Sequence, residues 1–330
     1  MLARKRPLCI SGIKVESGTR MSGILNLAER PALTLGIPIT VIRGSKPGKT
    51  LCLTAGVHGC EYVGIEAALR ISRNLSPKQL KGTLIVVPII NLPAFQTRTP
   101  YVCPIDNVNI NRVFPGKREG SISHQIANTL FREVILKADY LIDLHGGDSV
   151  ESLCPFTLFF ASGNRKIDRV SRQLCSMFKV DYVVARRTAG ASYTEAAKAG
   201  IPAIVAEAGE KGLIDEKNVS LLYEGVHNTL RYLGMIHGAP DRPHEQTMLY
   251  QTTFLYADKG GLFYPNVPAG TRVNKGTIVG TVRNIHGQTL QTITVPSKSV
   301  VLCESSNPVV EAGGFLAMIG YLDPVRVAHS

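Results

Sequence analysis

Tryptophan and long apolar runs are both absent from this chain of 330 residues. A helix that spans a bilayer needs roughly 20 consecutive apolar residues, and no run in the sequence approaches that length. The segment behind the basic N-terminus, residues 11–20, is polar and lacks the apolar core of a signal peptide. We therefore expect a cytoplasmic protein that does not bind membranes.

Paired cysteines are also lacking. The chain has seven cysteines, an odd number, and none of them forms a C-x-x-C motif. This pattern argues against a disulfide framework and against a zinc site made of thiolates. Cys60 and Cys103 could be reactive thiols, but we interpret them as small buried apolar side chains.

Acidic residues are too few to balance the basic ones. The 25 aspartates and glutamates stand against 37 lysines and arginines, which gives a formal net charge of +12. Such an excess favours an anionic partner. The basic residues are dispersed, however, and no segment interleaves them with aromatic residues, so nucleic-acid binding is disfavoured. A small substrate that carries a carboxylate fits the charge better.

Up to about residue 238, strand-like apolar runs alternate with segments of helical spacing. This alternation predicts an α/β sheet with helices on both faces. The first two strands, within residues 39–55, are predicted to form a β-hairpin. Strands are expected at residues 39–42, 50–55, 84–90, 140–144, 156–160, 182–185 and 201–206, and helices at residues 62–75, 123–137, 166–178, 193–199 and 219–233.

The character of the chain changes after a linker at residues 238–243. Beyond it, short β-type runs alternate with glycine, proline and asparagine turns, which is typical of a small all-β barrel or sandwich. The pattern over residues 270–280 is similar to a biotinyl/lipoyl-type β-sandwich, but the usual context of a carrier lysine is missing. We predict a catalytic α/β domain at residues 1–240 and a β-domain at residues 241–330 that supports or caps the site.

The most informative motif is the pair His58 and Glu61, which lies between a strand-like run and a helix-like run. At such a turn, both side chains can reach one cation. His145 ends another apolar run and offers a second imidazole in the same kind of position. Two histidines and one glutamate, with a fourth position left for water, form a catalytic zinc arrangement. We predict one zinc ion per chain.

The surroundings of the two histidines strengthen this interpretation. Glycines flank both of them, Gly59 and Gly146 among others, and permit a close approach of backbone or substrate. Catalytic residues of open α/β sheets lie at the carboxyl ends of strands, where both histidines fall. Each histidine alone could equally be an ordinary residue with local hydrogen bonds, so the prediction depends on their combination.

Glu207 directly follows the apolar run 201–206 and is our candidate for the general base. A carboxylate near an activated water can take its proton and later pass it to the leaving amine. Glu210 is the second choice, although a surface loop position is the simpler interpretation for it.

Residues 91–120 form a long irregular segment, which indicates a functional loop. Arg112 can bind a substrate carboxylate bidentately, and Asn111 can donate its amide to the same group. Arg98 is the candidate that faces the developing oxyanion. Asp143 shares a side of its strand with His145 and could orient that imidazole. Arg112 could instead be a solvated loop arginine. Asp143 could instead be a buried aspartate that accepts hydrogen bonds from backbone amides.

These motifs, in this order, resemble the succinylglutamate desuccinylase/aspartoacylase family, whose members are zinc enzymes on the carboxypeptidase fold. The resemblance covers roughly residues 10–330. It implies a mixed sheet flanked by helices. It is carried by His58-x-x-Glu61, Asn111-Arg112-Val-Phe-Pro-Gly, Asp143-Leu-His145 and Glu207-x-Gly209.

The resemblance also implies roles for individual residues. His58, Glu61 and His145 would bind zinc, and Glu207 would be the general acid/base. Asn111 and Arg112 would grip the substrate carboxylate. Arg98 matches the oxyanion arginine of the family if a short insertion around residues 100–104 is allowed, and Cys60 replaces the usual asparagine between the first two ligands.

We therefore predict a zinc-dependent hydrolase that uses metal-activated water to cleave the amide bond of a small anionic N-acyl amino acid or a related N-acylated amine. The rivals are a metallocarboxypeptidase that acts on peptides and a non-catalytic binding protein on the same fold. A β-domain that narrows the cleft disfavours the first, and the complete set of candidate residues disfavours the second. The acyl group and the amino acid stay open, as does homo-oligomerisation through the edges of the β-domain.

Overall fold

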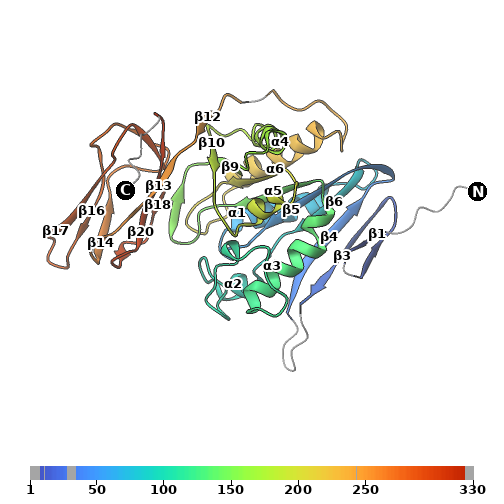
Figure 1. Cartoon of the computed structure of the whole chain (residues 1–330), viewed down its shortest axis with the longest axis horizontal. Helices are drawn as coiled ribbons and strands as arrows, with labels where there is room; N and C mark the ends of the chain where they lie inside the picture. The colour runs from blue at the N-terminus through green and yellow to red at the C-terminus, as the bar shows by residue number, and fades with distance from the viewer. Residues whose placement is uncertain (1–7, 11, 28–34, 243, 324–330) are drawn as a thin grey trace, which may run out of the picture.

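The computed structural model describes residues 8–10, 12–27, 35–242 and 244–323. Figure 1 shows a large α/β body with two smaller β-sheets at one end, formed mainly by the C-terminal strands. Within these residues, no helix combines the length and the apolar composition needed to cross a membrane.

Nine strands form the central sheet. In spatial order they are β12 (Thr247–Leu249), β10 (Tyr182–Arg186), β9 (Phe156–Phe160), β11 (Ala203–Glu207), β7 (Tyr140–His145), β5 (Lys46–Ala55), β6 (Lys81–Val87), β4 (Gly36–Arg43) and β3 (Thr19–Asn26). Strands β11, β7, β5 and β6 run parallel, whereas β9 lies antiparallel to β11, and β4 lies antiparallel to β6 and β3. The sheet is therefore mixed, as predicted. The short strands β1 (Leu8–Ile10) and β2 (Ile13–Val15) pair with each other outside it.

The predicted hairpin over residues 39–55 is wrong, because β6 lies between β4 and β5. After β5 the chain crosses over through helix α1 (Tyr62–Asn74) and returns as β6, parallel to β5. Parallel strands need such a crossover, whereas a short turn joins only antiparallel neighbours. The turn after β4 packs instead against the start of β6, where the Gly44 N–H donates to the Gly82 carbonyl at 2.9 Å.

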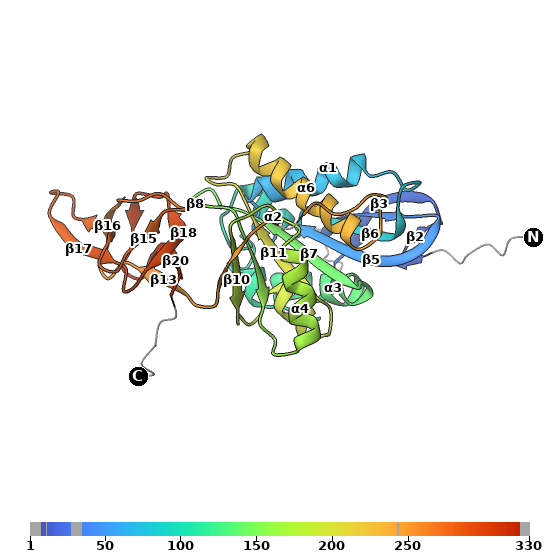
Figure 2. The same ribbon diagram turned by 90° about the horizontal axis from the view of Figure 1, so that it is seen from above.

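Helices cover both faces of the sheet, because successive residues of a strand point to opposite faces. Helices α1, α4 (Arg165–Cys175) and α6 (Glu216–Tyr232) pack on one face, and α3 (Ile122–Glu133) and α5 (Ser192–Lys198) on the other. Figure 2 shows α1 and α6 on one side and α3 on the opposite side. Leu141 of β7 points to the face of α3 and α5. Asp143 and His145 follow at intervals of two residues and therefore share that face.

The C-terminal part is all-β in the residues described beyond the linker, as predicted. Its two sheets pack around a core of their own, which includes Phe263, Val282 and Leu316. One sheet contains β13 (Thr252–Tyr256), β20 (Phe315–Tyr321), β18 (Ser299–Ser305) and β15 (Arg272–Val273), and the other contains β17 (Thr289–Thr294), β16 (Ile278–Arg283), β14 (Gly261–Pro265) and β19 (Val309–Val310).

The two parts of the chain exchange strands. Strand β8 (Glu151–Leu153) precedes the linker but pairs with β18 of the C-terminal part. Strand β12 follows the linker but pairs with β10 of the large sheet. These two pairings attach the C-terminal sheets to the α/β body. One of them involves β8, the strand that follows His145 in the sequence. The domain boundary at residue 240 stays a prediction.

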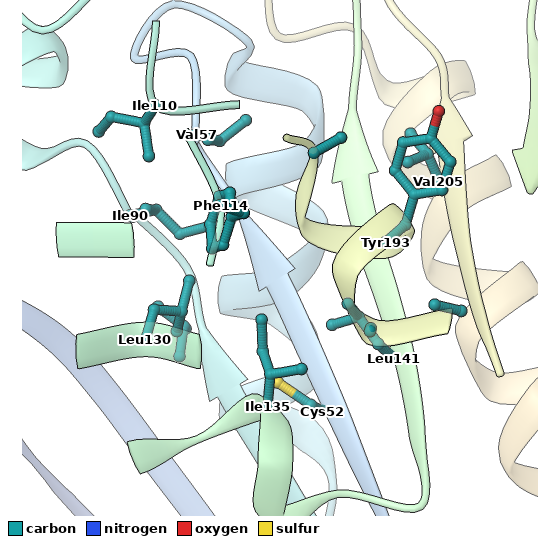
Figure 3. Packing of buried hydrophobic residues seen from close by; sticks show 14 of the residues in the cluster. Cys52, Val57, Ile90, Ile110, Phe114, Leu130, Ile135, Leu141, Tyr193 and Val205 are labelled. Carbon is teal, nitrogen blue, oxygen red and sulfur yellow. The ribbon is translucent and has the colours of Figure 1, made fainter. Parts of the chain in front are cut away.

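Residues 91–120 contain short ordered elements, α2 (Leu92–Thr97) and the 3-10 turn η1 (Ile110–Arg112). Ile110 and Phe114 are buried and belong to the same apolar cluster as Val57. Figure 3 shows the three side chains near one another beside β5. Because the core holds the segment on both sides, the intervening residues 111 and 112 have a defined position.

Asp106 fastens this segment to the start of α3. Its carboxylate accepts hydrogen bonds from the Ser121 hydroxyl at 2.5 Å and from the amide and hydroxyl of Ser123, both at 2.8 Å. The Val108 amide donates to it at 3.3 Å. Burial opposes ionisation, but the hydrogen bonds from Ser121 and Ser123 outweigh it and lower the pKa of Asp106 below its ordinary value.

We expect Asp106→Asn to reduce the free energy of unfolding by about 1–3 kcal/mol at neutral pH, because hydrogen bonds to a charged acceptor are lost. The folded pKa lies below the unfolded one, so this contribution is complete above the unfolded pKa and disappears as the pH falls through the folded pKa. Urea unfolding between pH 7 and about pH 2.5 should show the difference between wild type and variant shrinking toward acid pH. Asp258→Asn, at an exposed aspartate, is the control. A difference that does not change with pH would contradict the role of the charge.

Candidate metal centre and substrate pocket

The predicted metal ligands and the predicted general base come together at the carboxyl ends of three adjacent strands, β11, β7 and β5. His58 lies in the turn between β5 and α1, Glu61 directly precedes α1, and His145 is the last residue of β7. Glu207 ends β11 and is the register partner of His145. One edge of the sheet therefore carries all four side chains, where open α/β sheets place their ligand sites.

The three potential ligands are buried, with exposed fractions of 9% for His58 and 3% for both Glu61 and His145. Glu61 bridges the two imidazoles. Its Oε1 lies 2.6 Å from His58 Nδ1, and its Oε2 lies 2.9 Å from His145 Nδ1. One ligand atom from each residue lies within 4.8 Å of the other two. Both histidines thus present the same ring atom to one carboxylate.

The other nitrogen of each ring has its own contact. His58 Nε2 lies 3.3 Å from Asn109 Oδ1, and His145 Nε2 lies 3.3 Å from Asp143 Oδ2. Contacts of this kind orient an imidazole for metal binding. They leave Nδ1 of both rings facing Glu61.

Asp143 is held firmly behind His145. Its side chain is completely buried. It accepts a hydrogen bond from the Thr54 hydroxyl at 2.7 Å and another from the Ser192 hydroxyl. Thr54 belongs to β5 and Ser192 begins α5, so the sheet and a helix together fix the aspartate that fixes the imidazole.

The centre favours positive charge. Burial opposes protonation of His145, but Glu61 and Asp143 outweigh it and raise the pKa of this imidazole well above its ordinary value. Burial also opposes ionisation of Glu61, but the two histidines hold its pKa below the ordinary range. The negative charges of the buried carboxylates Glu61 and Asp143 therefore stabilise a cation at this position.

The donor set fits a zinc ion. Zinc takes imidazole nitrogens and carboxylate oxygens at about 2.0–2.2 Å, which places tetrahedral ligand atoms roughly 3.4 Å apart. The observed limit of 4.8 Å requires only small side-chain movements to reach that spacing. Glu61 Oε2 is buried and has no aligned hydrogen bond among the described residues, so an electron pair is available to a metal.

Two glycines permit this packing. A Cβ atom on Gly59 would lie 2.3 Å from the Phe95 backbone nitrogen, and one on Gly146 would lie 2.3 Å from the Ala208 carbonyl oxygen. The close approach that the sequence predicts is thus to the backbone of the chain itself.

A pocket of about 170 Å³ adjoins the metal ligands, and Glu207, Asn111 and Arg112 line it. Asn111 is buried and its Oδ1 accepts a hydrogen bond from the Ser192 amide at 3.1 Å. Arg112 donates from Nη1 to the Asn111 carbonyl at 2.8 Å. These contacts hold both residues in the pocket wall.

Glu207 lies in a desolvated position with acidic neighbours. Burial raises the pKa of its carboxyl group, His145 opposes the change, and Glu61 and Glu151 add to the rise. The pKa of Glu207 is therefore above its ordinary range, which suits a group that accepts and returns a proton.

Arg98 is the predicted site residue that the structure does not bring to the pocket. It caps the C-terminal end of α2 in the left-handed region, with φ of 55°. Its side chain is exposed and lies outside the pocket lining. The oxyanion role of Arg98 therefore stays a prediction from the sequence. Glu210, the second choice for the base, also lies outside the lining, and its carboxylate is 3.5 Å from Lys211 Nζ.

Arg186 lines the pocket and was missed by sequence reasoning. It ends β10, which runs parallel to β9 and hence opposite to β11. Tyr182 stands level with Phe156 and thus with Glu207, so Arg186 lies four residues, about 13 Å, further along the sheet. The pocket therefore extends from the metal centre along the sheet face toward this guanidinium. No sequence motif marks such a position.

Glu151 and Tyr101 also line the pocket and were also missed. Glu151 follows His145 by six positions, and this nearness in sequence was a signal that could have been used. Tyr101 belongs to the irregular segment 91–120 and has no distinctive neighbours.

The C-terminal sheet forms one wall of the pocket. Four of its residues contribute: Phe254, Cys303, Phe315 and Met318. The Arg186 guanidinium lies 4.6 Å from the centroid of the Phe254 ring, within the range of a cation–π contact. The β-domain thus takes part in the site, as a capping module would.

Arg186 also borders a larger surface groove of about 790 Å³. Four further arginines line that groove: Arg165, Arg169, Arg172 and Arg187. These arginines place positive charge beside the pocket, where it raises the local concentration of anions.

Comparisons with known proteins identify related sequences and structures. The family model described as the Succinylglutamate desuccinylase/Aspartoacylase catalytic domain matches residues 47–233. The N-alpha-acetyl-L-2,4-diaminobutyric acid deacetylase of Halomonas elongata is 28% identical over 253 residues, which cover 74% of this chain and 73% of that protein.

Solved structures are similar over almost their whole length. The succinylglutamate desuccinylase/aspartoacylase structure from Rhodobacter sphaeroides has a TM-score of 0.84 at 25% identity, over 93% of this chain and 96% of that chain. The product-bound ectoine utilization protein from Ruegeria pomeroyi has a TM-score of 0.87 at 24% identity, over 96% and 99% of the two chains. At 24% identity, the comparison with the Ruegeria pomeroyi protein shows similarity of fold alone.

Elemental analysis of the purified protein should find about one zinc ion per chain, and His58→Ala should lose it, because a carboxylate and a single imidazole bind zinc weakly. His286→Ala removes an exposed histidine of the C-terminal part and should retain the metal. Wild-type protein without zinc, even after zinc is added, would contradict the assignment of the centre.

Proposed function

We propose, from the premise that this chain belongs to the succinylglutamate desuccinylase/aspartoacylase family, that it hydrolyses the amide bond of a small N-acyl amino acid. The chain is an amide-hydrolysing enzyme of that family. One observation carries the proposal: a single small pocket joins the cluster of His58, Glu61 and His145 to Glu207 and to two arginines.

His58, Glu61 and His145 would hold a zinc ion. Zinc in such a site supplies a Lewis acid that polarises a carbonyl oxygen and acidifies water. The protein contributes the orientation of the ligands, since Asn109 and Asp143 contact the outer nitrogens of the two rings. It also contributes a partly enclosed pocket, in which electrostatic interactions are stronger than in water.

Glu207 is the general acid/base. It stands beside His145 on the neighbouring strand and lines the pocket. Its raised pKa suits two successive proton transfers. The carboxylate removes a proton from the attacking water, and the resulting carboxylic acid then protonates the departing amine.

Asn111 and Arg112 bind the substrate carboxylate. The guanidinium of Arg112 can form two parallel hydrogen bonds with a carboxylate, and the buried position of Asn111 supports its place in the wall. Arg186 adds a second positive charge to the same pocket. Neither guanidinium group forms an ion pair with a carboxylate of the residues that the structure describes, and this favours an anionic substrate.

The size of the pocket supports a small substrate over a peptide. Its volume of about 170 Å³ is below the range of roughly 300–1,000 Å³ that is usual for drug-sized ligands. The relative from Halomonas elongata is named for an N-alpha-acetylated amino acid. N-acetyl amino acids are therefore the first substrates to test, before succinylated ones and peptides.

The C-terminal part supports the site as a cap. We infer that residues 241–330 form a barrel-sandwich of the lipoyl type without a carrier function, an inference supported by its two packed sheets. Its residues in the pocket wall limit the length of the substrate. A cytoplasmic location stays a prediction from the N-terminal sequence.

Glu207→Gln should retain zinc and lose turnover by a factor of at least about 10², because the amide cannot take up the proton. Steady-state kinetics with N-acetyl amino acids, together with zinc analysis, provide the measurement. Glu210→Gln, outside the pocket, is the matched control and should keep wild-type kinetics. Near-normal turnover in Glu207→Gln would remove Glu207 from the mechanism.

Arg112→Lys should raise KM by roughly tenfold or more, because a point charge replaces a bidentate pair. Arg118→Lys, at an exposed position of the same segment, is the control. Measuring kcat and KM separately matters here, since a lost carboxylate contact changes binding more than chemistry. Unchanged kinetics in Arg112→Lys would exclude the carboxylate clamp.

A further inference from the structure

The pocket contains an acidic side chain that the proposed mechanism does not use. Glu151 begins β8, lines the pocket, and lies where β8 pairs with β18. The Asp148 amide donates to its Oε2 at 3.4 Å, and Tyr101 forms a side-chain hydrogen bond with it. None of the described lysines, arginines or histidines forms an ion pair with Glu151. His58 acts on it electrostatically, but that imidazole already contacts Glu61.

Tyr101, which interacts with Glu151, has a strained backbone conformation. Its φ of 57° is in the left-handed region, which is unfavourable for a side chain of this size. The Asp148 carboxylate accepts the Tyr101 N–H at 3.0 Å and stabilises this conformation. The Tyr101 ring also lies edge-on to His58, with centroids 6.0 Å apart. Strain of this kind is concentrated at functional sites.

The pocket is lined by basic and acidic side chains together. Arg112 and Arg186 line it with Glu61, Glu151 and Glu207. Among the described residues, neither arginine forms an ion pair with Glu151. A substrate with a carboxylate alone would neutralise only the arginines.

We propose that Glu151, together with the hydroxyl oxygen of Tyr101, binds a protonated primary amine of the substrate. The substrate class is then an N-acyl amino acid that carries both a carboxylate and an ammonium group. The ammonium N–H groups donate to the Glu151 carboxylate, while the carboxylate of the substrate accepts from the guanidinium groups. This inference rests on the proposed deacylase function and adds the charge pattern of its substrate.

The environment of Glu151 agrees with a cationic ligand. Burial opposes the ionisation of Glu151. A carboxylate at such a position is unfavourable unless a cation or hydrogen bonds compensate for the lost hydration. Charge-assisted hydrogen bonds from an ammonium group would compensate for the lost hydration.

Two pairs of isosteric substrates test the proposal at pH 7. Nα-acetyl-2,4-diaminobutyrate and Nα-acetylnorvaline differ by an ammonium against a methyl group in the amino-acid half. Glycylnorvaline and propionylnorvaline differ in the same way in the acyl half. We expect wild-type kcat/KM to favour the cationic member of one pair by at least about tenfold, through KM. The pair that shows the preference identifies the half that carries the amine.

Glu151→Gln keeps the shape of the side chain and removes its charge. We expect it to abolish the preference, so that the ratio of kcat/KM between the cationic substrate and its neutral isostere falls at least about tenfold. The ratio is the diagnostic quantity, because Glu151 also raises the pKa of Glu207 and its loss can change the turnover of both substrates in common. Glu304→Gln is the matched control, because Glu304 lies on β18 beside β8 but outside the pocket lining. It should keep the preference. Zinc content and thermal unfolding of both variants report whether the fold and the centre are intact.

The outcomes separate this inference from the proposed function. If wild type hydrolyses the neutral substrates as well as the cationic ones, or if Glu151→Gln lowers both members of a pair equally, the ammonium site is excluded and the deacylase function stands. If wild type with bound zinc cleaves no N-acyl amino acid, the proposed function itself fails.

Discussion

The buried carboxylate of Glu61 is the charge on which the rest of the site depends. It stands at the N-terminus of α1, where the helix dipole favours a negative group, and it contacts an imidazole on each side. Because α1 is the crossover between β5 and β6, the sheet topology determines where this carboxylate lies. His145 contacts it from β7, the strand next to β5, and Glu207 ends β11, the strand beyond β7. The geometry of the centre is thus a direct result of the order of three parallel strands.

The reversed direction of β9 and β10 shapes the pocket beyond that centre. If all strands were parallel, the site would be confined to one edge of the sheet. Instead, the pocket extends along the sheet face to Arg186, and the C-terminal sheet forms its outer wall. The exchange of β8 and β12 ties that wall to the catalytic body. A small pocket lined by acidic and basic side chains follows from this arrangement, and its volume agrees with the short substrate that we propose.

Much of the fold and of the centre could be predicted because the signals are local. Apolar runs located the strands of the sheet except the two at its edges, β3 and β12, and the glycines around His58 and His145 marked the turns at the strand ends. The hairpin at residues 39–55 was wrong because a short connection between two strands does not reveal a third strand inserted between them. The position of Arg98 in the long irregular segment led to its prediction as a site residue. In the structure, Arg98 is the left-handed C-cap of α2 and its side chain is exposed to solvent.

The sequence by itself determined the chemical groups: two imidazoles, their bridging carboxylate, the glutamate of β11, and the asparagine–arginine pair. These residues lie at strand ends or in one marked loop, and neighbours in the sequence identify them. Only the tertiary structure decided that Tyr101, Glu151 and Arg186 share the same pocket, and that a β-domain closes it. Their positions depend on strand direction and on pairing between distant segments, such as β8 with β18. These are long-range interactions, which a local pattern of residues does not encode.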